Sequence, residues 1–261
     1  MSKKLSLKFK QDSFTEFLEK FSDLTSIDDV VKLKIDKDET LMYSVISNEV
    51  TVLALKNYII KTKDFIENFN EEETYDFIIT SANKFAKNLK FINPNQPIKV
   101  DLTTKKSPDD DYVYQVRAAQ FTNGKMKITT IGGENYRIRD LTKVVLNARL
   151  DTKNSKWNFQ ITQEDFNNIK KLSTINNEDK TFNITVDKGI VTFHEPNKWE
   201  LEVAEIKPHN STIIFNKKYL GNINSDKELI NFNIFENFIL IKDTESNLML
   251  SFEQDFSTDD D

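Results

Sequence analysis

The sequence contains no cysteine, and it has only five glycines, five prolines and two histidines among its 261 residues. The absence of cysteine excludes disulfides, thiolate nucleophiles and sulfur-bound zinc. No apolar run is long enough to span a bilayer, and the N-terminus has no signal-peptide pattern, so we expect a cytoplasmic protein that does not interact with membranes. The low glycine and proline content indicates a well-structured chain.

Side chains suited to catalysis are few and poorly arranged. His194 and His209 are far apart in the sequence, near turns, and neither has a serine or aspartate partner that would suggest a triad. The run Asp109–Asp111 is typical of a solvated loop, because metal catalysis needs carboxylates that converge from separate elements. Gly132-Gly133 lacks the Lys-Ser/Thr and the helix of a phosphate-binding loop, so it predicts a turn. We therefore expect no enzymatic activity, no cofactor and no metal.

One pattern occurs four times along the chain: an alternating apolar strand leads into a short amphipathic helix. The strands begin at Leu5, Tyr75, Trp157 and Ile213. The apolar helix positions that follow them are Phe14, Phe17 and Phe21, then Phe85 and Leu89, then Phe166, Ile169 and Leu172, then Tyr219, Leu220 and Ile223. The spacing between copies is unequal, which excludes a solenoid of fixed period.

Three segments of period-two alternation follow each predicted helix. They are 30–36, 40–47 and 50–57, then 98–104, 112–120 and 125–131, then 181–187, 190–195 and 199–206, and finally 229–235, 238–243 and 247–253. Asn123-Gly124 is a strong hairpin signal, and segment 58–73 has room for an extra helical turn. Each copy therefore predicts a β-α-β-β-β unit, and the fold class is α+β with short helices.

The widest gap between copies indicates two domains of two units each. It contains Gly132-Gly133 and a stretch without a regular strand pattern. The predicted N-terminal domain covers residues 1–140, a connector covers 141–155, and the C-terminal domain covers 156–256. Residues 257–261 are polar and acidic, and we expect a disordered tail there.

Lysines occupy the side of the predicted helices opposite to the apolar positions. They are Lys84, Lys87 and Lys90 in the second copy, Lys170 and Lys171 in the third, and Lys217 and Lys218 in the fourth. The first helix is mixed, with Lys20 beside Glu16 and Glu19. In a chain of net charge −6, this pattern predicts a basic helical face on an acidic protein. Exposed helical lysines also serve ordinary solvation, so both interpretations stay open at this point.

Two such units per domain and two domains per chain resemble the plan of DNA polymerase sliding clamps. The likeness is to the two-domain type, which includes the proliferating cell nuclear antigen family and the clamps of tailed phages. It extends over nearly the whole chain and is clearest at 5–14, 41–55 and 159–166. The resemblance implies the DNA-clamp fold and a head-to-tail homotrimer, a six-domain ring that encircles duplex DNA without sequence preference.

The same resemblance implies partners and a role in DNA replication. The ring would act as a processivity factor that tethers a replicative DNA polymerase, and a clamp-loader ATPase would open it. The protein would work in the cytoplasm, which would be that of a bacterial host if a bacteriophage encodes the chain.

Particular residues receive roles from this resemblance. The helical lysines, Lys20 included, would face the phosphates of DNA. Two edge strands would join neighbouring subunits, one carrying Tyr136, Arg137 and Arg139 and the other Trp199, Glu200, Glu202 and Glu205. The alternative is that both segments are ordinary strands with polar outer faces.

The resembling family also has a hydrophobic pocket under its connector, where partner peptides dock. The matching positions are Val45 in the first unit, Val144, Val145, Leu146 and Leu150 on the connector, and Phe252 and Phe256 near the C-terminus. Plain core packing is the alternative for each position, and it is the stronger interpretation for Val50 and Val52.

Three other functions remain open at the level of sequence. One is a clamp-fold processivity factor of herpesvirus type that holds DNA directly as a monomer or dimer, although the net charge of −6 counts against it. The others are a metal-dependent nuclease that uses acidic loops and a β-rich structural component of a virion.

Overall fold

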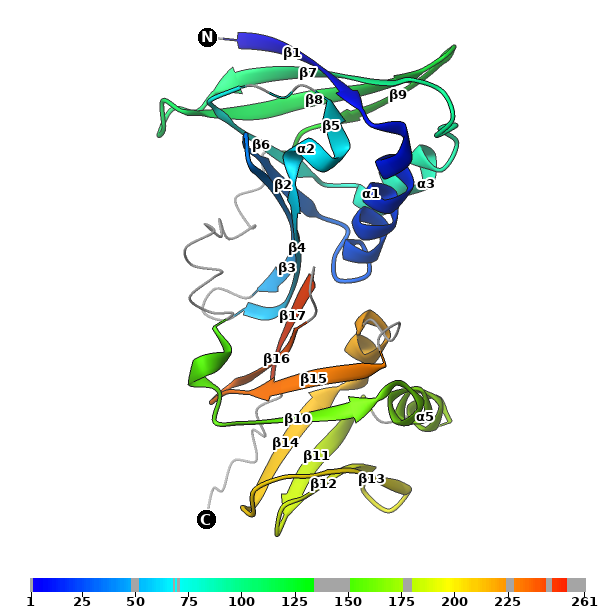
Figure 1. Ribbon diagram of the computed structural model, residues 1–261, viewed down its shortest axis with the longest axis vertical. Helices are drawn as coiled ribbons and strands as arrows, with labels where there is room; N and C mark the ends of the chain where they lie inside the picture. Colours follow the sequence, from blue (N-terminus) through cyan, green and yellow to red (C-terminus); the bar gives the residue numbers. More distant parts are fainter. Residues whose placement is uncertain are drawn as a thin grey trace. The chain divides into compact units, whose positions relative to one another are not determined.

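Each of the four repeats contains the predicted strand, helix and three strands (Figure 1). The computed structural model describes residues 2–47, 52–67, 69, 71–133, 151–175, 180–223, 228–242 and 246–252. The first repeat comprises β1 (Ser2–Phe9), α1 (Gln11–Leu24), β2 (Val31–Ile35), β3 (Glu39–Ser47) and β4 (Val52–Lys61). The second comprises β6 (Thr74–Ile79), α3 (Ala82–Leu89), β7 (Ile98–Lys106), β8 (Val113–Asn123) and β9 (Met126–Ile131).

The third and fourth repeats have the same order, with one difference in the helix. The third comprises β10 (Trp157–Thr162), α5 (Gln163–Thr174), β11 (Thr181–Asp187), β12 (Ile190–Glu195) and β13 (Trp199–Glu205). The fourth comprises β14 (Ser211–Asn216), η2 (Lys217–Asn222), β15 (Leu229–Ile234), β16 (Phe238–Lys242) and β17 (Ser246–Ser251). Element η2 is a 3₁₀-helix of six residues, shorter and tighter than the predicted amphipathic α-helix.

Three short elements stand outside the repeats. They are α2 (Thr62–Phe65), β5 (Ile66–Glu67) and the 3₁₀-helix η1 (Thr152–Asn154). The single turn of α2 lies inside segment 58–73, where the sequence left room for one. The α+β fold class predicted from the sequence is therefore confirmed.

The chain divides into two units by its internal contacts. Unit 1 comprises residues 1–47 and 55–143, and unit 2 comprises residues 48–54 and 144–261. The start of β4 thus belongs to unit 2, where the Ser251 hydroxyl donates a hydrogen bond of 2.5 Å to the Val52 carbonyl. In the described part of the chain, no helix is long and apolar enough to cross a membrane.

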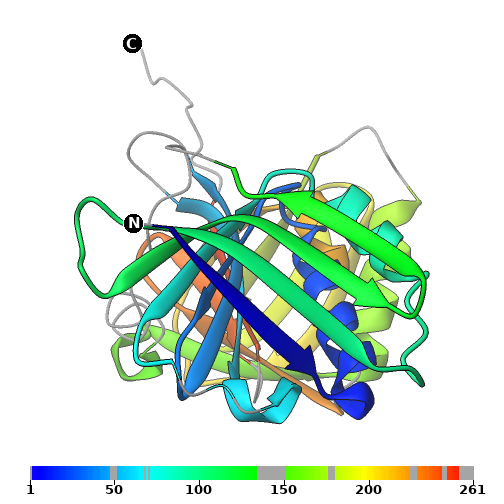
Figure 2. The ribbon, with the colours of Figure 1, turned by 90° about the horizontal axis from the view of Figure 1, so that it is seen from above.

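The strands of unit 1 follow the order β4-β3-β2-β6-β8-β7-β1-β5, and β9 pairs with β8. Figure 2 shows β1 in dark blue beside β7, consistent with their antiparallel register from Ser2↔Lys105 to Phe9↔Ile98. The contact between β6 and β8 is parallel and short, limited to residues 74–76 and 113–115. Beyond it, the amides of Gly132 and Gly133 donate to the carbonyls of Arg117 and Ile78.

Close backbone approach explains why glycine occupies position 132. A Cβ atom there would lie 2.0 Å from the Val116 carbonyl oxygen, a distance that no side chain can occupy. Gly132 forms an antiparallel β-bridge with Ile79 at this close approach, so the predicted turn at Gly132-Gly133 is not observed.

An aromatic core holds the helices of unit 1 on the sheet. The ring of Phe9 on β1 lies 5.8 Å from Phe14 and 5.0 Å from Phe17 on α1, and 6.0 Å from Phe121 on β8. The Phe21 ring of α1 meets Phe85 of α3 edge to face at 5.8 Å. The predicted helical spacing of these residues thus buries one face of each helix.

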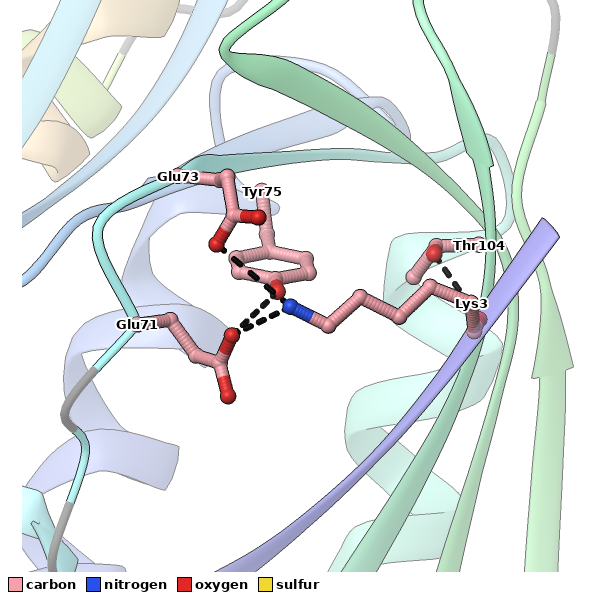
Figure 3. Close-up of polar contacts among 5 residues, drawn as sticks. All are labelled: Lys3, Glu71, Glu73, Tyr75 and Thr104. Atoms are coloured by element: carbon pink, nitrogen blue, oxygen red, sulfur yellow. Dashed lines mark hydrogen bonds and ion pairs between the residues drawn. The ribbon is translucent and has the colours of Figure 1, made fainter. Parts of the chain in front are cut away.

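A polar cluster fastens the segment before β6 to the start of β1 (Figure 3). The Lys3 ammonium forms ion pairs with Glu71 and, at 3.4 Å, with Glu73, and the Tyr75 hydroxyl donates to Glu71 at 3.1 Å. The hydrogen bond with Lys3 lowers the pKa of Glu71 and raises the pKa of Lys3. Burial raises the pKa of Tyr75 to about 12, so this hydroxyl stays neutral. The cluster therefore carries fixed opposite charges at neutral pH.

Unit 2 has two sheets. One has the order β10-β15-β16-β17 and the other β13-β12-β11-β14. Aromatic rings from both sheets meet in its core: Phe159 stacks on Phe232 at 4.9 Å, and Phe193 contacts Phe159 at 6.1 Å and Phe182 at 5.8 Å. Helix α5 adds the fully buried side chains of Phe166 and Ile169.

Candidate nucleic-acid interface

Helix α3 presents three lysines to solvent. Its buried side consists of Ala82, Phe85, Ala86 and Leu89, and the exposed residues include Lys84, Lys87 and Lys90. Asp29, in the loop before β2, fixes the start of the helix, because its carboxylate accepts a hydrogen bond of 2.7 Å from the Asn83 amide. The predicted exposure of these three lysines is confirmed.

The surroundings of α3 in the sequence are free of acidic residues. No Asp or Glu occurs between residues 80 and 100, and none occurs between 112 and 131. These two stretches include all of α3, β8 and β9. A local positive field can therefore form here despite the net charge of −6.

Helix α5 has a basic C-terminal half and an acidic first turn. The Thr162 hydroxyl accepts a hydrogen bond of 3.1 Å from the Asp165 amide, which caps the helix, and Glu164 and Asp165 complement its dipole. Lys171 is exposed, whereas Lys170 is half-buried with its ammonium 4.9 Å from the centre of the Phe166 ring. Of the two predicted lysines, Lys171 is the better placed for a ligand.

The two lysines of η2 differ from one another. Lys218 is exposed, and its ammonium lies 4.6 Å from the centre of the Tyr219 ring. Lys217 forms an ion pair of 2.5 Å with Glu195, whose side chain is fully buried at the end of β12. The expectation that both lysines lie on an open helical face is wrong for Lys217, because its charge compensates a buried carboxylate.

Helix α1 corrects the prediction for Lys20. This side chain is 10% exposed, forms an ion pair of 2.6 Å with Glu16, and has its ammonium 6.0 Å from the centre of the Tyr58 ring. The charged residues that α1 does expose are Asp12, Glu16 and Glu19. Lys20 packs toward β4, so the solvent-facing surface of α1 is acidic and not mixed as the sequence suggested.

A second ion pair lies beneath the same helix. Lys56 on β4 is 2% exposed and lies 2.6 Å from the Asp23 carboxylate, which also accepts a hydrogen bond from the Tyr58 hydroxyl. Lysine is almost never fully buried unless it is paired. Lys56 therefore has a structural role within unit 1.

Among the strands that the structure describes, β13 lies at one end of its sheet, beside β12, and is an edge strand. Glu200, Glu202 and Glu205 on it are exposed, and Trp199 is half-buried. Charged side chains along an edge are a common protection against unwanted pairing and also a means of choosing a partner. The other predicted interface residues, Tyr136, Arg137 and Arg139, lie outside the described residues.

Sequence reasoning did not single out β9 as a second edge strand. Among the strands that the structure describes, β9 pairs only with β8. Its exposed positions are Lys127, Thr129 and Ile131, so it is the less acidic of the two edges. The hairpin signal Asn123-Gly124 located β9, but its place at the edge depends on long-range pairing of β8 with β6 and β7.

The predicted pocket for partner peptides is described only in part. Val45 is 6% exposed in β3, and it is a buried position. Phe252 is half-buried and its ring lies 6.2 Å from Phe215. The remaining positions, Val144, Val145, Leu146, Leu150 and Phe256, lie outside the described residues.

Two of the side chains considered for catalysis, His209 and Asp111, make contacts with other residues of the fold. The ring of His209 lies against Trp157 at 5.1 Å, and its Nδ1 atom lies 3.0 Å from the Lys207 carbonyl oxygen. Asp111 pairs with Lys106 at 2.6 Å, and this hydrogen bond lowers the pKa of Asp111. Within the described ranges, no group of three or more His, Cys, Asp or Glu side chains could hold a metal ion.

Comparison with known proteins gave no matching family model and no matching curated protein, but many similar solved structures. The proliferating cell nuclear antigen of Thermococcus kodakaraensis is 13% identical with a TM-score of 0.62, and the match covers 95% of this chain and 99% of that one. A PCNA2–PCNA3 complex from Sulfolobus tokodaii gives 10% identity and a TM-score of 0.59, with 95% and 99% coverage. The DNA polymerase sliding clamp of Bacillus subtilis gives 11% identity and a TM-score of 0.63.

The similar proteins fall into two groups by chain length, one close in length to this chain and the other longer. The match covers 97% of this chain but 65% of the Bacillus subtilis clamp, whereas the archaeal chains are matched over almost their full length. Identities of 10 to 13% support the fold alone. With the four β-α-β-β-β repeats and these similarities, the chain has the fold of the DNA sliding clamps.

Proposed function

We propose that this protein is a sliding clamp, a DNA polymerase processivity factor that encircles duplex DNA and performs no chemistry. The observation that carries the proposal is helix α3, which exposes Lys84, Lys87 and Lys90 in a stretch without acidic residues, on a clamp fold. Lys171 and Lys218 add exposed charge on the corresponding elements of unit 2. Lysine–phosphate contacts of this kind bind DNA regardless of sequence.

The proposed assembly is a head-to-tail homotrimer. Its interface would join an edge of one subunit to β13 of the next, with Arg137 and Arg139 opposite Glu200, Glu202 and Glu205, and with Tyr136 and Trp199 beside them. Strand β9 offers a second candidate edge, and its half-buried Met126 and Ile128 would suit Leu201 and Val203 of β13. A heterologous contact of this type produces a ring when the rotation closes.

The proposed partners follow from the same function. A replicative DNA polymerase would dock on a pocket formed by the connector residues Val144 to Leu150 with Val45, Phe252 and Phe256, and a clamp-loader ATPase would open the ring. Because Val45 is buried, it would line the wall of such a pocket and would not be an exposed contact for a peptide. The setting would be the cytoplasm of a cell, which for a phage-encoded chain is the bacterial host.

A topological test separates encirclement from simple binding. Sedimentation should give a mass of three times the 30.5 kDa chain. At a salt concentration that screens lysine–phosphate contacts, the protein should stay on nicked circular plasmid during gel filtration and leave it after a single restriction cut. A monomer that binds circular and linear DNA equally would identify a direct binder, and magnesium-dependent plasmid cleavage would identify a nuclease.

A further inference from the structure

An exposed aromatic residue follows the basic helix α3 directly. Phe91 is 72% exposed, and it comes immediately after Lys90 and four residues after Lys87. Single exposed apolar residues are common and need no explanation by themselves. Two further observations, the rigidity of the turn and its charge, set this one apart.

The backbone at Phe91 is held in a closed turn. The Phe91 amide donates to the Asn88 carbonyl at 3.1 Å, and the Ile92 amide donates to the Leu89 carbonyl at 3.0 Å. Leu89 and Ile92 on either side of the turn are buried, at 0% and 5% exposed. The anchored neighbours leave the Phe91 ring in solvent, with little freedom to fold back into the core.

The loop after Phe91 is anchored by Asn123, a buried side chain at the end of β8. Its amide nitrogen donates to the carbonyls of Asn93, Gln96 and Pro97 at 3.1 to 3.3 Å, and its oxygen accepts from the Asn93 amide at 3.0 Å. Both N–H groups of this amide and its oxygen thus take part in fixing the loop. The platform that carries Phe91 is therefore preorganised.

Positive charge surrounds this platform. Lys84, Lys87 and Lys90 are exposed on α3, and Lys125 is exposed in the hairpin turn whose Gly124 lies against Gln96. The nearest stretches of sequence, 80–100 and 112–131, contain no acidic residue. An aromatic face among cations is the arrangement that binds single-stranded nucleic acid, because the base stacks on the ring while lysines contact the phosphates.

The chain contains a matched counterexample. Tyr112 is 73% exposed, nearly the same as Phe91, but it follows Asp109–Asp111 and its amide donates to the Asp110 carboxylate at 2.8 Å. The three carboxylates beside Tyr112 repel the phosphates of a nucleic acid, so this ring is poorly placed to stack on a base. The two residues therefore differ in surrounding charge and not in exposure.

We propose that Phe91, with Lys87, Lys90 and Lys125, binds single-stranded DNA by stacking of an unpaired base on the Phe91 ring. This site goes beyond the encirclement of duplex DNA, since the bases inside a duplex are stacked on their neighbours and cannot stack on the Phe91 ring. It would engage a single-stranded segment next to a duplex, such as a template end.

The test measures binding of fluorescein-labelled dT20 and of a blunt duplex of equal length by anisotropy. The Phe91→Ala variant should bind dT20 roughly tenfold more weakly, from the usual contribution of one stacked base, with duplex affinity unchanged within twofold. Tyr112→Ala should match the wild type on both ligands. Because both side chains are exposed, thermal unfolding should be unchanged in both variants.

A gain-of-signal variant gives a second readout. Phe91→Trp should bind dT20 as tightly as the wild type, because the indole ring can also stack on a base. The fluorescence of the introduced indole, measured above the background of Trp157 and Trp199, should be quenched when dT20 binds. The proposal is overturned if wild type does not bind dT20, if Phe91→Ala binds it normally, if both ligands are lost together, or if the Phe91→Trp emission does not change.

The outcome is separable from that of the proposed function. Loss of retention on circular plasmid by the wild type would remove the ring proposal and leave a Phe91-dependent dT20 site standing. If the wild type is retained on circular plasmid but dT20 binding does not depend on Phe91, the ring proposal stands and the Phe91 site is excluded.

Discussion

The lysines near helix α1 form ion pairs within unit 1, whereas the lysines of helix α3 are exposed to solvent. Lys20 pairs with Glu16, and Lys56 is buried against Asp23. By contrast, Lys84, Lys87 and Lys90 are exposed, and Asp29 is occupied with the backbone at the start of α3. Both helices pack on the same aromatic core, through Phe21 and Phe85.

This difference shows that packing and surface charge are set independently in repeated units. Aromatic residues at helical spacing are required on both helices, because each must cover the sheet. The solvent-facing side has no such requirement, so one helix can become acidic and another basic without a change of fold. A count of lysines per helix therefore does not measure its affinity for DNA. What matters is whether each lysine is paired with a carboxylate of the protein or is exposed to a ligand.

The largest expected effect comes from charge reversal on α3. The triple variant Lys84→Glu, Lys87→Glu and Lys90→Glu should lower duplex affinity at least about 100-fold and reduce the salt slope by about 2.7, since three phosphate contacts are lost. Fluorescence anisotropy with a duplex across a salt series measures both quantities. The matched α1 variant Asp12→Asn with Glu19→Gln removes acidic charge and should strengthen binding about threefold.

Unchanged affinity and slope in the triple variant would mean that the α3 lysines only solvate the helix. In that case the contrast between the two helices would have no bearing on DNA. The α1 variant keeps Glu16, so that Lys20 stays paired and the comparison changes only exposed charge.

Much of the fold could be predicted because it depends on local pattern. Period-two alternation placed β11 and β12 at their observed bounds, and helical spacing identified the buried faces of α1, α3 and α5. The third and fourth repeats differ in the helix, and a six-residue segment such as 217–222 carries too little periodicity to separate a 3₁₀-helix from an α-helix.

The errors at the candidate site have a common physical cause. Lys20 and Lys217 sit at positions that a helical pattern assigns to solvent, yet each has a partner that the pattern does not contain. For Lys20 the Tyr58 ring comes from β4, and for Lys217 the Glu195 carboxylate comes from β12. Tyr58 and Glu195 lie on strands that are distant in the sequence from these two lysines, so local sequence cannot reveal the contacts. Arg137, Arg139 and the connector valines stay predictions.

A smaller effect is expected from removal of a lysine that the fold uses. Lys56→Met keeps the aliphatic volume but leaves the Asp23 carboxylate without its cation. Because Asp23 is 32% exposed and keeps the Tyr58 hydroxyl, the cost should fall below that of a fully buried pair, at about 2 kcal/mol of unfolding free energy. Urea unfolding measures it, with duplex affinity unchanged.

Lys87→Met is the control on the other helix. Its side chain is exposed, so unfolding free energy should change by less than about 0.5 kcal/mol while duplex affinity falls. Equal stability of the two variants would remove the distinction between lysines that support the fold and lysines that are available to a ligand.

The smallest effect should come from the exposed pair at the start of β1. Glu71→Gln removes the charge opposite Lys3 but keeps an acceptor for Tyr75. Both side chains are about a third exposed, so the loss at pH 7 should be about 0.5 kcal/mol. The pKa of Glu71 is lowered in the folded state, so its contribution is present above the ordinary value of 4.5 and disappears as pH falls through the lowered value. Wild type and variant should therefore converge in urea unfolding as the pH falls well below 4.5, whereas Glu72→Gln, whose side chain is 76% exposed, should match the wild type throughout. A difference that persists at low pH would show that Glu71 stabilises the fold through packing and not through its charge. In that case the ion pair between Glu71 and Lys3 would contribute nothing to stability.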